Sequence, residues 1–248
     1  MTELAIIGGT GLTSLKSLEI IRREVVHTPY GEASGPLTHG VLFGKEVVFL
    51  ARHGYGHTIP PHKINYRANM WALQHTGVKK VIAVAAVGGI RDDMLPGRLA
   101  IPDQIIDYTW SRKNTFFEDG LTQVTHIDFT YPYSEELRNI LIQGCKSGKI
   151  ESCENGIYGV TQGPRLETIA EINRMERDGC AMVGMTGMPE AALARELDLH
   201  YATCAVVVNW AAGRGGEGGV IKMEDIEATV KTGMDKVRTM LEYVLPLI

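Results

Sequence analysis

The chain has 248 residues, of which 44% are hydrophobic and 22% are charged, the composition of an ordinary water-soluble globular protein. Its formal net charge of −4 offers no basic surface for nucleic acid or for an acidic membrane, so we expect small-molecule ligands instead. No apolar run approaches the length of a membrane span, and the acidic N-terminal start is not typical of a signal peptide.

Strand-like apolar runs and helical patterns follow one another along the chain. Strands are expected at 4–9, 46–54, 79–89, 97–107, 156–163, 180–186 and 200–209. Helices are expected at 63–77, from Ser134 onward, at 166–179, at 188–199 and from about Met223 to Tyr243. Because strands and helices alternate from residue 79 and several strands are apolar on both faces, we predict an α/β fold with helices on both sides of the sheet.

The cysteines indicate the redox compartment, and the absence of repeats and linkers indicates the number of domains. Cys145, Cys153, Cys180 and Cys204 are scattered and form no C-x-x-C pair, which is typical of reduced, mostly buried thiols in the cytoplasm. The chain has no internal repeat, low-complexity tract or polar linker. We therefore expect residues 1–248 to form a single cytoplasmic domain.

The GGTG turn at 8–11 follows the first expected strand. Its backbone N–H groups and the Thr10 hydroxyl could cradle an oxyanion, although a plain tight turn would look the same. A dinucleotide-binding fingerprint would need glycine where Ser14 stands. The chain also contains no G-x-x-x-x-G-K-[ST] phosphate-binding loop of the kind found in nucleoside triphosphatases.

The RHGYGH segment at 52–57 follows another strand and places Arg52 beside His53. A planar guanidinium suits phosphate, so the pair is a candidate anion site. Three histidines lie in 53–62, but glycines interrupt any helix that would align them, and no acidic or cysteine ligand is near. We therefore predict no metal.

Two further strand exits carry polar residues. TQGPRLET offers Glu167, which could also be an ordinary first-turn acid facing a helix dipole, and VGMTGMPE offers Thr186 beside Met185, which could be core. Thr10, Arg52, His53 and Thr186 are neutral or cationic donors on separate strand exits. Because ligands gather at strand ends in α/β sheets, these four could surround one phosphate. No G-x-S-x-G elbow or Ser-His-Asp order indicates a serine hydrolase.

The chain resembles the purine nucleoside and methylthioadenosine phosphorylase family in five segments: GGTGL, RHGYGHTIPPHKINYRANMWAL, GPRLET, GMTGMPE and VVVNWAAG. The resemblance runs in register from Ile6 to about Ile226. It implies a single α/β domain with a twisted, mixed central sheet flanked by helices, assembled as a homotrimer. It also implies that phosphate cleaves a purine nucleoside to the free base and a ribose 1-phosphate, with no metal and no organic cofactor.

The family's site positions map onto this chain residue by residue. The phosphate positions match Thr10, Arg52, His53, Thr186 and the backbone of Ala86, whereas Ala85 stands where the family often has a hydroxyl residue. The substrate positions match Leu166, Glu167, Met185, Asn209, Ala211, Met223, Ile226 and, reaching the site of a neighbouring subunit, His126.

The purine end distinguishes two groups within the family. Members that cleave 6-aminopurines resemble one another in carrying aspartates at the positions of Asn209 and Ala211, and members that cleave 6-oxopurines resemble this chain. An amide can donate to O6 and accept from a protonating N7, and an ionised Glu167 suits the N1–H that a 6-oxopurine has. We therefore predict Asn209 as the catalytic residue and a hypoxanthine-like base.

The 5′ end differs from that of simple inosine phosphorylases, which resemble one another in having a histidine where Met223 aligns. Met223 and Ile226 would offer an apolar, polarizable surface, although their spacing also suits helix core. The resemblance thus implies phosphorolysis of 5′-methylthioinosine in purine salvage. A general 6-oxopurine nucleoside phosphorylase and a methylthioadenosine phosphorylase are the alternatives within the family. A nucleoside hydrolase and a non-catalytic anion-binding protein are the alternatives outside it.

Overall fold

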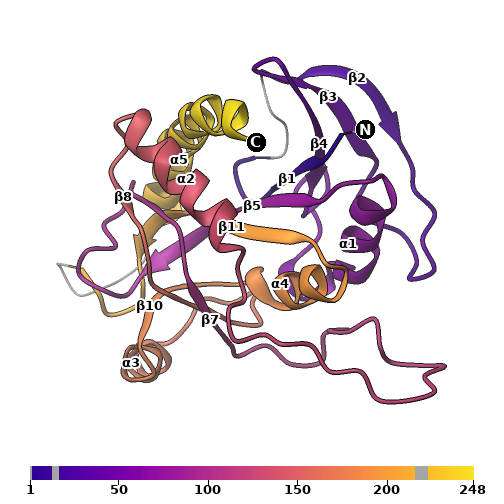
Figure 1. The fold of residues 1–248 in the computed structure, drawn as a ribbon. Helices are drawn as coiled ribbons and strands as arrows, with labels where there is room; N and C mark the ends of the chain where they lie inside the picture. The colour runs from indigo at the N-terminus through magenta and orange to yellow at the C-terminus, as the bar shows by residue number, and fades with distance from the viewer. Residues whose placement is uncertain (1, 13–16, 216–222) are drawn as a thin grey trace.

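The structure, a computed structural model, describes residues 2–12, 17–215 and 223–248 (Figure 1). Within them one mixed sheet contains β1 (Leu4–Gly8), β2 (Glu19–Glu24), β3 (Leu37–Leu42), β4 (Lys45–Ala51), β5 (Lys80–Gly89), β6 (Leu99–Ala100), β7 (Gln104–Asp107), β8 (Ser152–Cys153), β9 (Ile157–Val160), β10 (Cys180–Gly184) and β11 (His200–Trp210). The helices are α1 (Tyr66–His75), α2 (Glu135–Ser147), α3 (Ile169–Arg177), α4 (Gly187–Glu196) and α5 (Met223–Val244). The predicted α/β class is confirmed.

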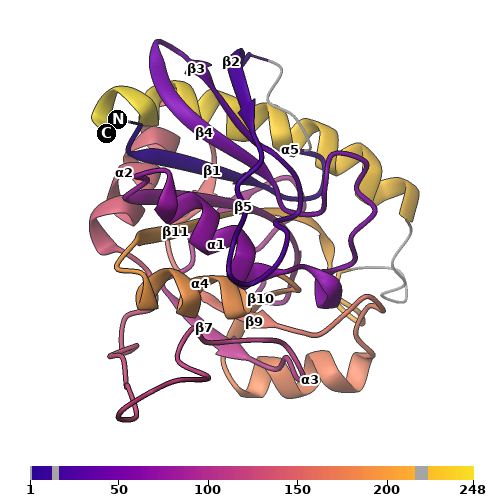
Figure 2. The same ribbon diagram turned by 90° about the vertical axis from the view of Figure 1, so that its right-hand side faces the viewer.

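Two apolar layers cover the two faces of the central strands (Figure 2). On one face, Ala5 and Ile7 of β1 pack in one core cluster with residues of α1 and α4. On the other face, Leu4 and Ile6 pack in a second cluster with residues of α2 and α5. All five residues of β1 are buried, as the prediction of strands apolar on both faces requires.

The central strands run in one direction. β1 pairs in parallel with both β4 and β5, and β11 pairs in parallel with β5. The carboxyl ends of these four strands therefore meet at one edge of the sheet, where the predicted GGTG, RHG and NWAAG segments emerge.

Strand β5 changes neighbours along its length. β1 accompanies it as far as the pair Ile7 and Ala83, and β10 joins the same side, antiparallel, at the pair Val183 and Gly88. Among the described strands none pairs with that side of β5 between these points. This stretch, 84–87, is therefore open to a ligand.

Two differences from the predicted elements have a clear physical cause. The single strand expected at 97–107 is split into β6 and β7, because Pro102 between them has no N–H to donate to a ladder. The helix expected from residue 166 begins at Ile169, because Thr168 is its N-cap and forms a capping box with Glu171.

The helix ends at Ser134 and Gly77 follow the prediction. The Ser134 Oγ accepts from the Leu137 N–H at 3.3 Å, and Gly77 just past α1 has a φ of +92°.

Three strands were not predicted: β8 is only two residues long, β2 (EIIRRE) is almost wholly exposed, and β3 is paired with β2 and β4 at this edge. An exposed edge strand has no apolar face to signal it in the sequence.

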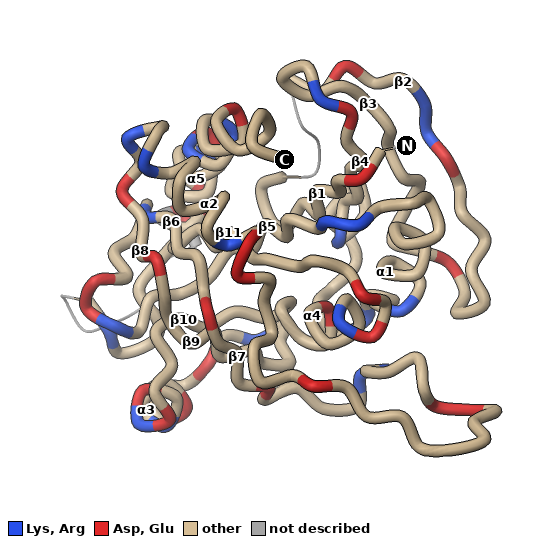
Figure 3. The backbone as a smooth tube through the Cα atoms, viewed as in Figure 1, with Lys and Arg blue, Asp and Glu red and all other residues tan. Residues whose placement is uncertain are grey.

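The surface carries mixed charge. Basic and acidic residues are interspersed along the backbone rather than separated onto opposite sides (Figure 3). No helix of the described chain is both long and apolar enough to cross a membrane. Part of the long segment between β7 and α2, residues 108–134, projects from the body as an arm (Figures 1 and 2).

Candidate functional site

A cavity of about 190 Å³ opens where the central strands end and β5 has no neighbour. Twelve of the predicted site residues line it: Thr10, Arg52, His53, Ala85, Ala86, Leu166, Glu167, Met185, Thr186, Asn209, Ala211 and Ile226. They come from seven different strands, strand exits or helices, so the fold brings together residues separated by up to 216 positions (226 − 10).

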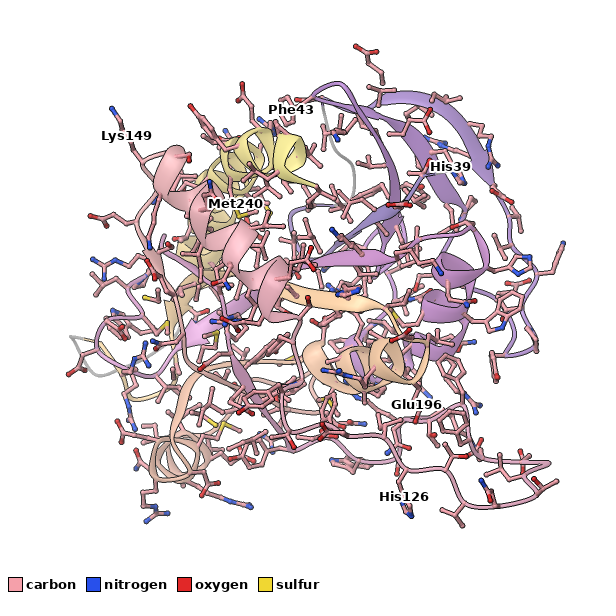
Figure 4. All side chains as sticks on the ribbon, in the orientation of Figure 1. His39, Phe43, His126, Lys149, Glu196 and Met240 are labelled. Carbon is pink, nitrogen blue, oxygen red and sulfur yellow. The ribbon has the colours of Figure 1, made fainter. Side chains whose placement is uncertain are left out.

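Two predicted site residues remain, one placed elsewhere and one whose side chain is not described. His126 is exposed on the arm, away from the strand ends of its own chain (Figure 4). Met223 begins α5, but its side chain lies outside the part of the chain that the structure describes.

Gly9 is needed because the Arg52 side chain passes beside it. A Cβ at this position would lie 2.5 Å from the Val84 carbonyl oxygen and 3.0 Å from the Arg52 Nη1. Arg52 Nη1 donates to that same carbonyl at 2.9 Å. The arginine thus satisfies a carbonyl on the stretch of β5 that β1 no longer accompanies.

Glu190, which the sequence reasoning missed, holds the other face of Arg52. Arg52 Nε and Nη2 donate to the two Glu190 oxygens at 2.7 and 2.8 Å, and the Tyr201 hydroxyl donates to Glu190 Oε1 at 2.8 Å. The side chains of both ions are buried, 1% and 0% exposed. Burial alone lowers the pKa of Arg52, but the charge and hydrogen bonds of Glu190 outweigh it and raise that pKa.

Arg52 therefore has fewer donors available for phosphate than a free guanidinium would have. Three of its five N–H groups are used by Glu190 and Val84, so two remain to donate towards the cavity. The only sequence signal for Glu190 is an acid in an otherwise apolar run, GMPEAALA, at the start of an expected helix.

His53 is uncharged at neutral pH. Burial, followed by the charge of Arg52, lowers the pKa of His53 to about 4. Its Nδ1 lies 2.8 Å from the Ile59 carbonyl oxygen, so Nδ1 carries the proton and Nε2 is left as an acceptor. Thr186 lines the cavity and its side chain makes no capping bond to α4. This end of the cavity thus combines hydroxyls, a cation and one acceptor nitrogen.

Asn209 reaches the cavity through a β-bulge. The register between β11 and β5 shifts between the pairs Val207 with Val87 and Asn209 with Gly88, so Val208 is an extra residue. A regular strand would turn Val208 and Asn209 to opposite faces, yet both line the cavity. The Asn209 Nδ2 donates to the Trp210 carbonyl at 2.6 Å, which fixes the amide and leaves its oxygen and a second N–H available.

Glu167 lies across the cavity on the segment before α3. It precedes the N-cap Thr168, and Glu171 forms the capping box, so the alternative of a first-turn helix acid does not apply. The Thr161 hydroxyl donates to Glu167 Oε1 at 2.6 Å. Burial raises the pKa of Glu167 despite this bond.

The raised pKa of Glu167 predicts an acidic limit to activity. If ionised Glu167 accepts the purine N1–H, kcat/KM should fall as pH falls through the raised pKa, that is, above the ordinary 4.5, because the protonated carboxyl loses its acceptor. The measurement is a pH profile of kcat/KM for wild type and for Glu167→Gln. The variant should be slower and should lose this acidic limb, and an identical limb in both would contradict the assignment.

A second, larger hollow of about 490 Å³ lies behind the Glu167 segment. Its arginines already have partners: Arg165 pairs with Glu171 at 2.7 Å and Arg174 with Asp178 at 3.7 Å. The smaller cavity is the better anion site because its cation keeps N–H groups free beside neutral donors.

Comparison with known proteins gives consistent findings. The chain matches the family described as Phosphorylase superfamily over residues 3–246. It is 54% identical over 245 residues to a probable S-methyl-5′-thioinosine phosphorylase of Pseudomonas syringae pv. tomato, covering 99% of each chain. It is 46% identical to a 6-oxopurine nucleoside phosphorylase of Pyrococcus furiosus, covering 100% of this chain and 94% of that one.

A solved structure shares the fold throughout. Methylthioadenosine phosphorylase from Schistosoma mansoni in complex with adenine superposes with a TM-score of 0.94 at 30% identity, covering 100% of this chain and 92% of that one. The predicted nucleoside phosphorylase-like architecture is thereby confirmed.

Proposed function

Because the chain belongs to the phosphorylase superfamily, we propose that its cavity catalyses phosphorolysis of S-methyl-5′-thioinosine. The products would be hypoxanthine and 5-methylthioribose 1-phosphate. The observation that carries the proposal is the purine end of the cavity, where Asn209 and Glu167 lie with the uncharged Ala211. Relatives named S-methyl-5′-thioinosine and 6-oxopurine nucleoside phosphorylases support it.

The phosphate end supplies the nucleophile. Thr10, Thr186 and the two free N–H groups of Arg52 would donate to inorganic phosphate, and His53 Nε2 would accept from a protonated phosphate oxygen. A phosphate oxygen then forms the new bond to C1′ as the C1′–N9 bond breaks. The electron pair of that bond passes to the purine.

The purine end stabilises the leaving group. Asn209 would donate to O6 through its second N–H and accept from N7–H through its oxygen, while Glu167 would accept from N1–H. N7 takes up one proton from solvent water as the base leaves, so hypoxanthine departs neutral. Adenine has no N1–H and would offer Glu167 no donor from the base, which disfavours it.

The remaining contacts belong to the 5′ end and to the assembly. Ile226 lines the cavity, and Met223 one turn earlier on α5 would complete an apolar wall for the methylthio group. A homotrimer in the cytoplasm would let His126 on the projecting arm reach the site of a neighbouring subunit. Phosphate is the only co-substrate in this scheme, with no metal or organic cofactor.

The base preference can be reversed by two substitutions. Changing Asn209→Asp together with Ala211→Asp supplies acceptors for a 6-amino group and removes the amide donor for O6. The ratio of kcat/KM for methylthioadenosine to that for methylthioinosine should rise by at least about 10²-fold, as expected when buried polar groups are re-matched. The single change Ala211→Ser is the steric control. An unchanged ratio in the double variant would contradict the proposal that Asn209 and Ala211 determine the base preference.

A second candidate function is a general 6-oxopurine nucleoside phosphorylase. The 46% identity to the Pyrococcus furiosus enzyme of that name favours it. Both functions would use the same residues of this chain at the phosphate and purine ends. They would differ only in whether the site accepts a 5′-hydroxyl as readily as a methylthio group.

A further inference from the structure

Arg112, at the base of the projecting arm, forms an unusual set of hydrogen bonds. Its Nε donates to Gln162 Oε1 at 3.0 Å, and its Nη2 donates to the carbonyls of Thr161 and Gln162 at 3.1 and 2.9 Å. Its Nη1 donates to the Met185 carbonyl at 2.9 Å, to the Met188 carbonyl and to the Tyr66 hydroxyl. Arg112 forms no ion pair with any carboxylate of the described residues, so neutral acceptors alone hold its charge.

Apart from Tyr66 on α1, these acceptors lie on two segments that carry opposite ends of the proposed site. Thr161 and Gln162 begin the loop that leads to Glu167, and the Thr161 hydroxyl donates to Glu167 at 2.6 Å. Met185 precedes Thr186 on the loop between β10 and α4, and Met188 follows in the first turn of α4, where its backbone is not helical. One guanidinium therefore fixes the loop of the purine-reading carboxylate to the loop of a phosphate-side hydroxyl.

Arg112 itself is not among the residues that line the cavity. Its guanidinium lies 5.4 Å from the centre of the Tyr66 ring, a cation–π contact that holds the plane of the group from outside the site. It can therefore act on a substrate only through the residues that it holds.

We propose that Arg112 is a positioning residue that sets the separation between Glu167 and Thr186, and so holds base and phosphate in reacting geometry. The inference rests on the proposed function of the cavity. A mutation far from the reacting atoms can cost about 10²-fold in rate if it displaces the reacting groups by about 1 Å. We therefore expect loss of the bridge between the two loops to lower the rate by about that factor. Lysine cannot replace it, because a single ammonium cannot span acceptors on both loops in one plane.

The test compares Arg112→Met and Arg112→Lys with a matched control, Arg67→Met. Arg67 also contacts the arm, through the Thr115 carbonyl at 3.3 Å and Glu118 at 2.8 Å, but it bonds to neither loop. With methylthioinosine and phosphate, kcat/KM should fall by about 10²-fold in Arg112→Met and by at least about 10-fold in Arg112→Lys. Arg67→Met should stay within about 3-fold of wild type. A near-normal rate in Arg112→Lys would overturn the proposal, and this variant also serves if Arg112→Met does not fold.

A double-mutant cycle separates positioning from general stabilisation. If Arg112 acts by placing Glu167, then Arg112→Lys should cost much less in a Glu167→Gln background than in wild type, and added guanidinium should partly restore Arg112→Met. Fold losses that simply multiply would overturn the positioning role and leave the proposed function intact. A normal rate in Glu167→Gln alone would instead overturn the base-reading proposal, and this inference with it.

Discussion

Replacing Asn209 by alanine is expected to lower kcat for 6-oxopurine nucleosides by about 10²–10³-fold, the loss typical of one donor aimed at developing charge. The amide is pre-oriented by its bond to the Trp210 carbonyl, so it needs no reorganisation when charge develops on the purine. Steady-state kinetics with saturating phosphate measure the effect. KM should change much less than kcat, because the interaction strengthens in the transition state.

The control for this substitution is Asn173→Ala. Asn173 is an exposed asparagine on α3 that accepts from Arg214 at 3.1 Å, away from the cavity. It should leave kcat within about 2-fold of wild type, as surface changes usually do. A near-normal kcat in Asn209→Ala, with the protein folded, would mean that another group stabilises the leaving purine.

Replacing Glu190 by glutamine is expected to lower the free energy of unfolding by about 3–5 kcal/mol, because it leaves the buried charge of Arg52 without its counter-ion. Both side chains are almost fully removed from water, so solvent cannot compensate. The released Arg52 should also lose its fixed direction, so KM for phosphate should rise. Urea denaturation and phosphate-dependent kinetics measure the two effects on the same variant.

Glu118→Gln is the comparison for this pair. Glu118 pairs with Arg67 at 2.8 Å, but its side chain is 36% exposed. Exposed ion pairs contribute little to stability, so this variant should lose far less than Glu190→Gln. Equal losses in the two variants would contradict the importance given to the buried pair.

The central strands and the strand exits could be predicted from sequence. The runs around β1, β5 and β11 are apolar on both faces, and the structure places them in the middle of the sheet between two helical layers. Polar residues follow β1 and β4 directly, so the parallel arrangement gathers Thr10 and Arg52 and brings the end of β11 to the same edge. Local pattern and topology thus carry most of the candidate site.

The supporting contacts could not be predicted, because they depend on pairs that are distant in sequence. Arg52 and Glu190 are 138 residues apart, and Arg112 bonds to Met188 across 76 residues. The bulge at Val208 depends on the register of β11 against β5, which the sequence of β11 alone does not contain. Such residues orient the site without carrying a motif of their own.

The most direct test of the proposed function compares methylthioinosine, methylthioadenosine, inosine and adenosine, each with and without phosphate. The expected result is phosphate-dependent release of hypoxanthine, with kcat/KM for methylthioinosine exceeding the others by at least about 10-fold, the discrimination that one apolar group provides. Equal activity on inosine would assign the chain to general 6-oxopurine phosphorolysis and would contradict an apolar wall at the 5′ end. A preference for methylthioadenosine, or base release without phosphate, would contradict the proposed reaction.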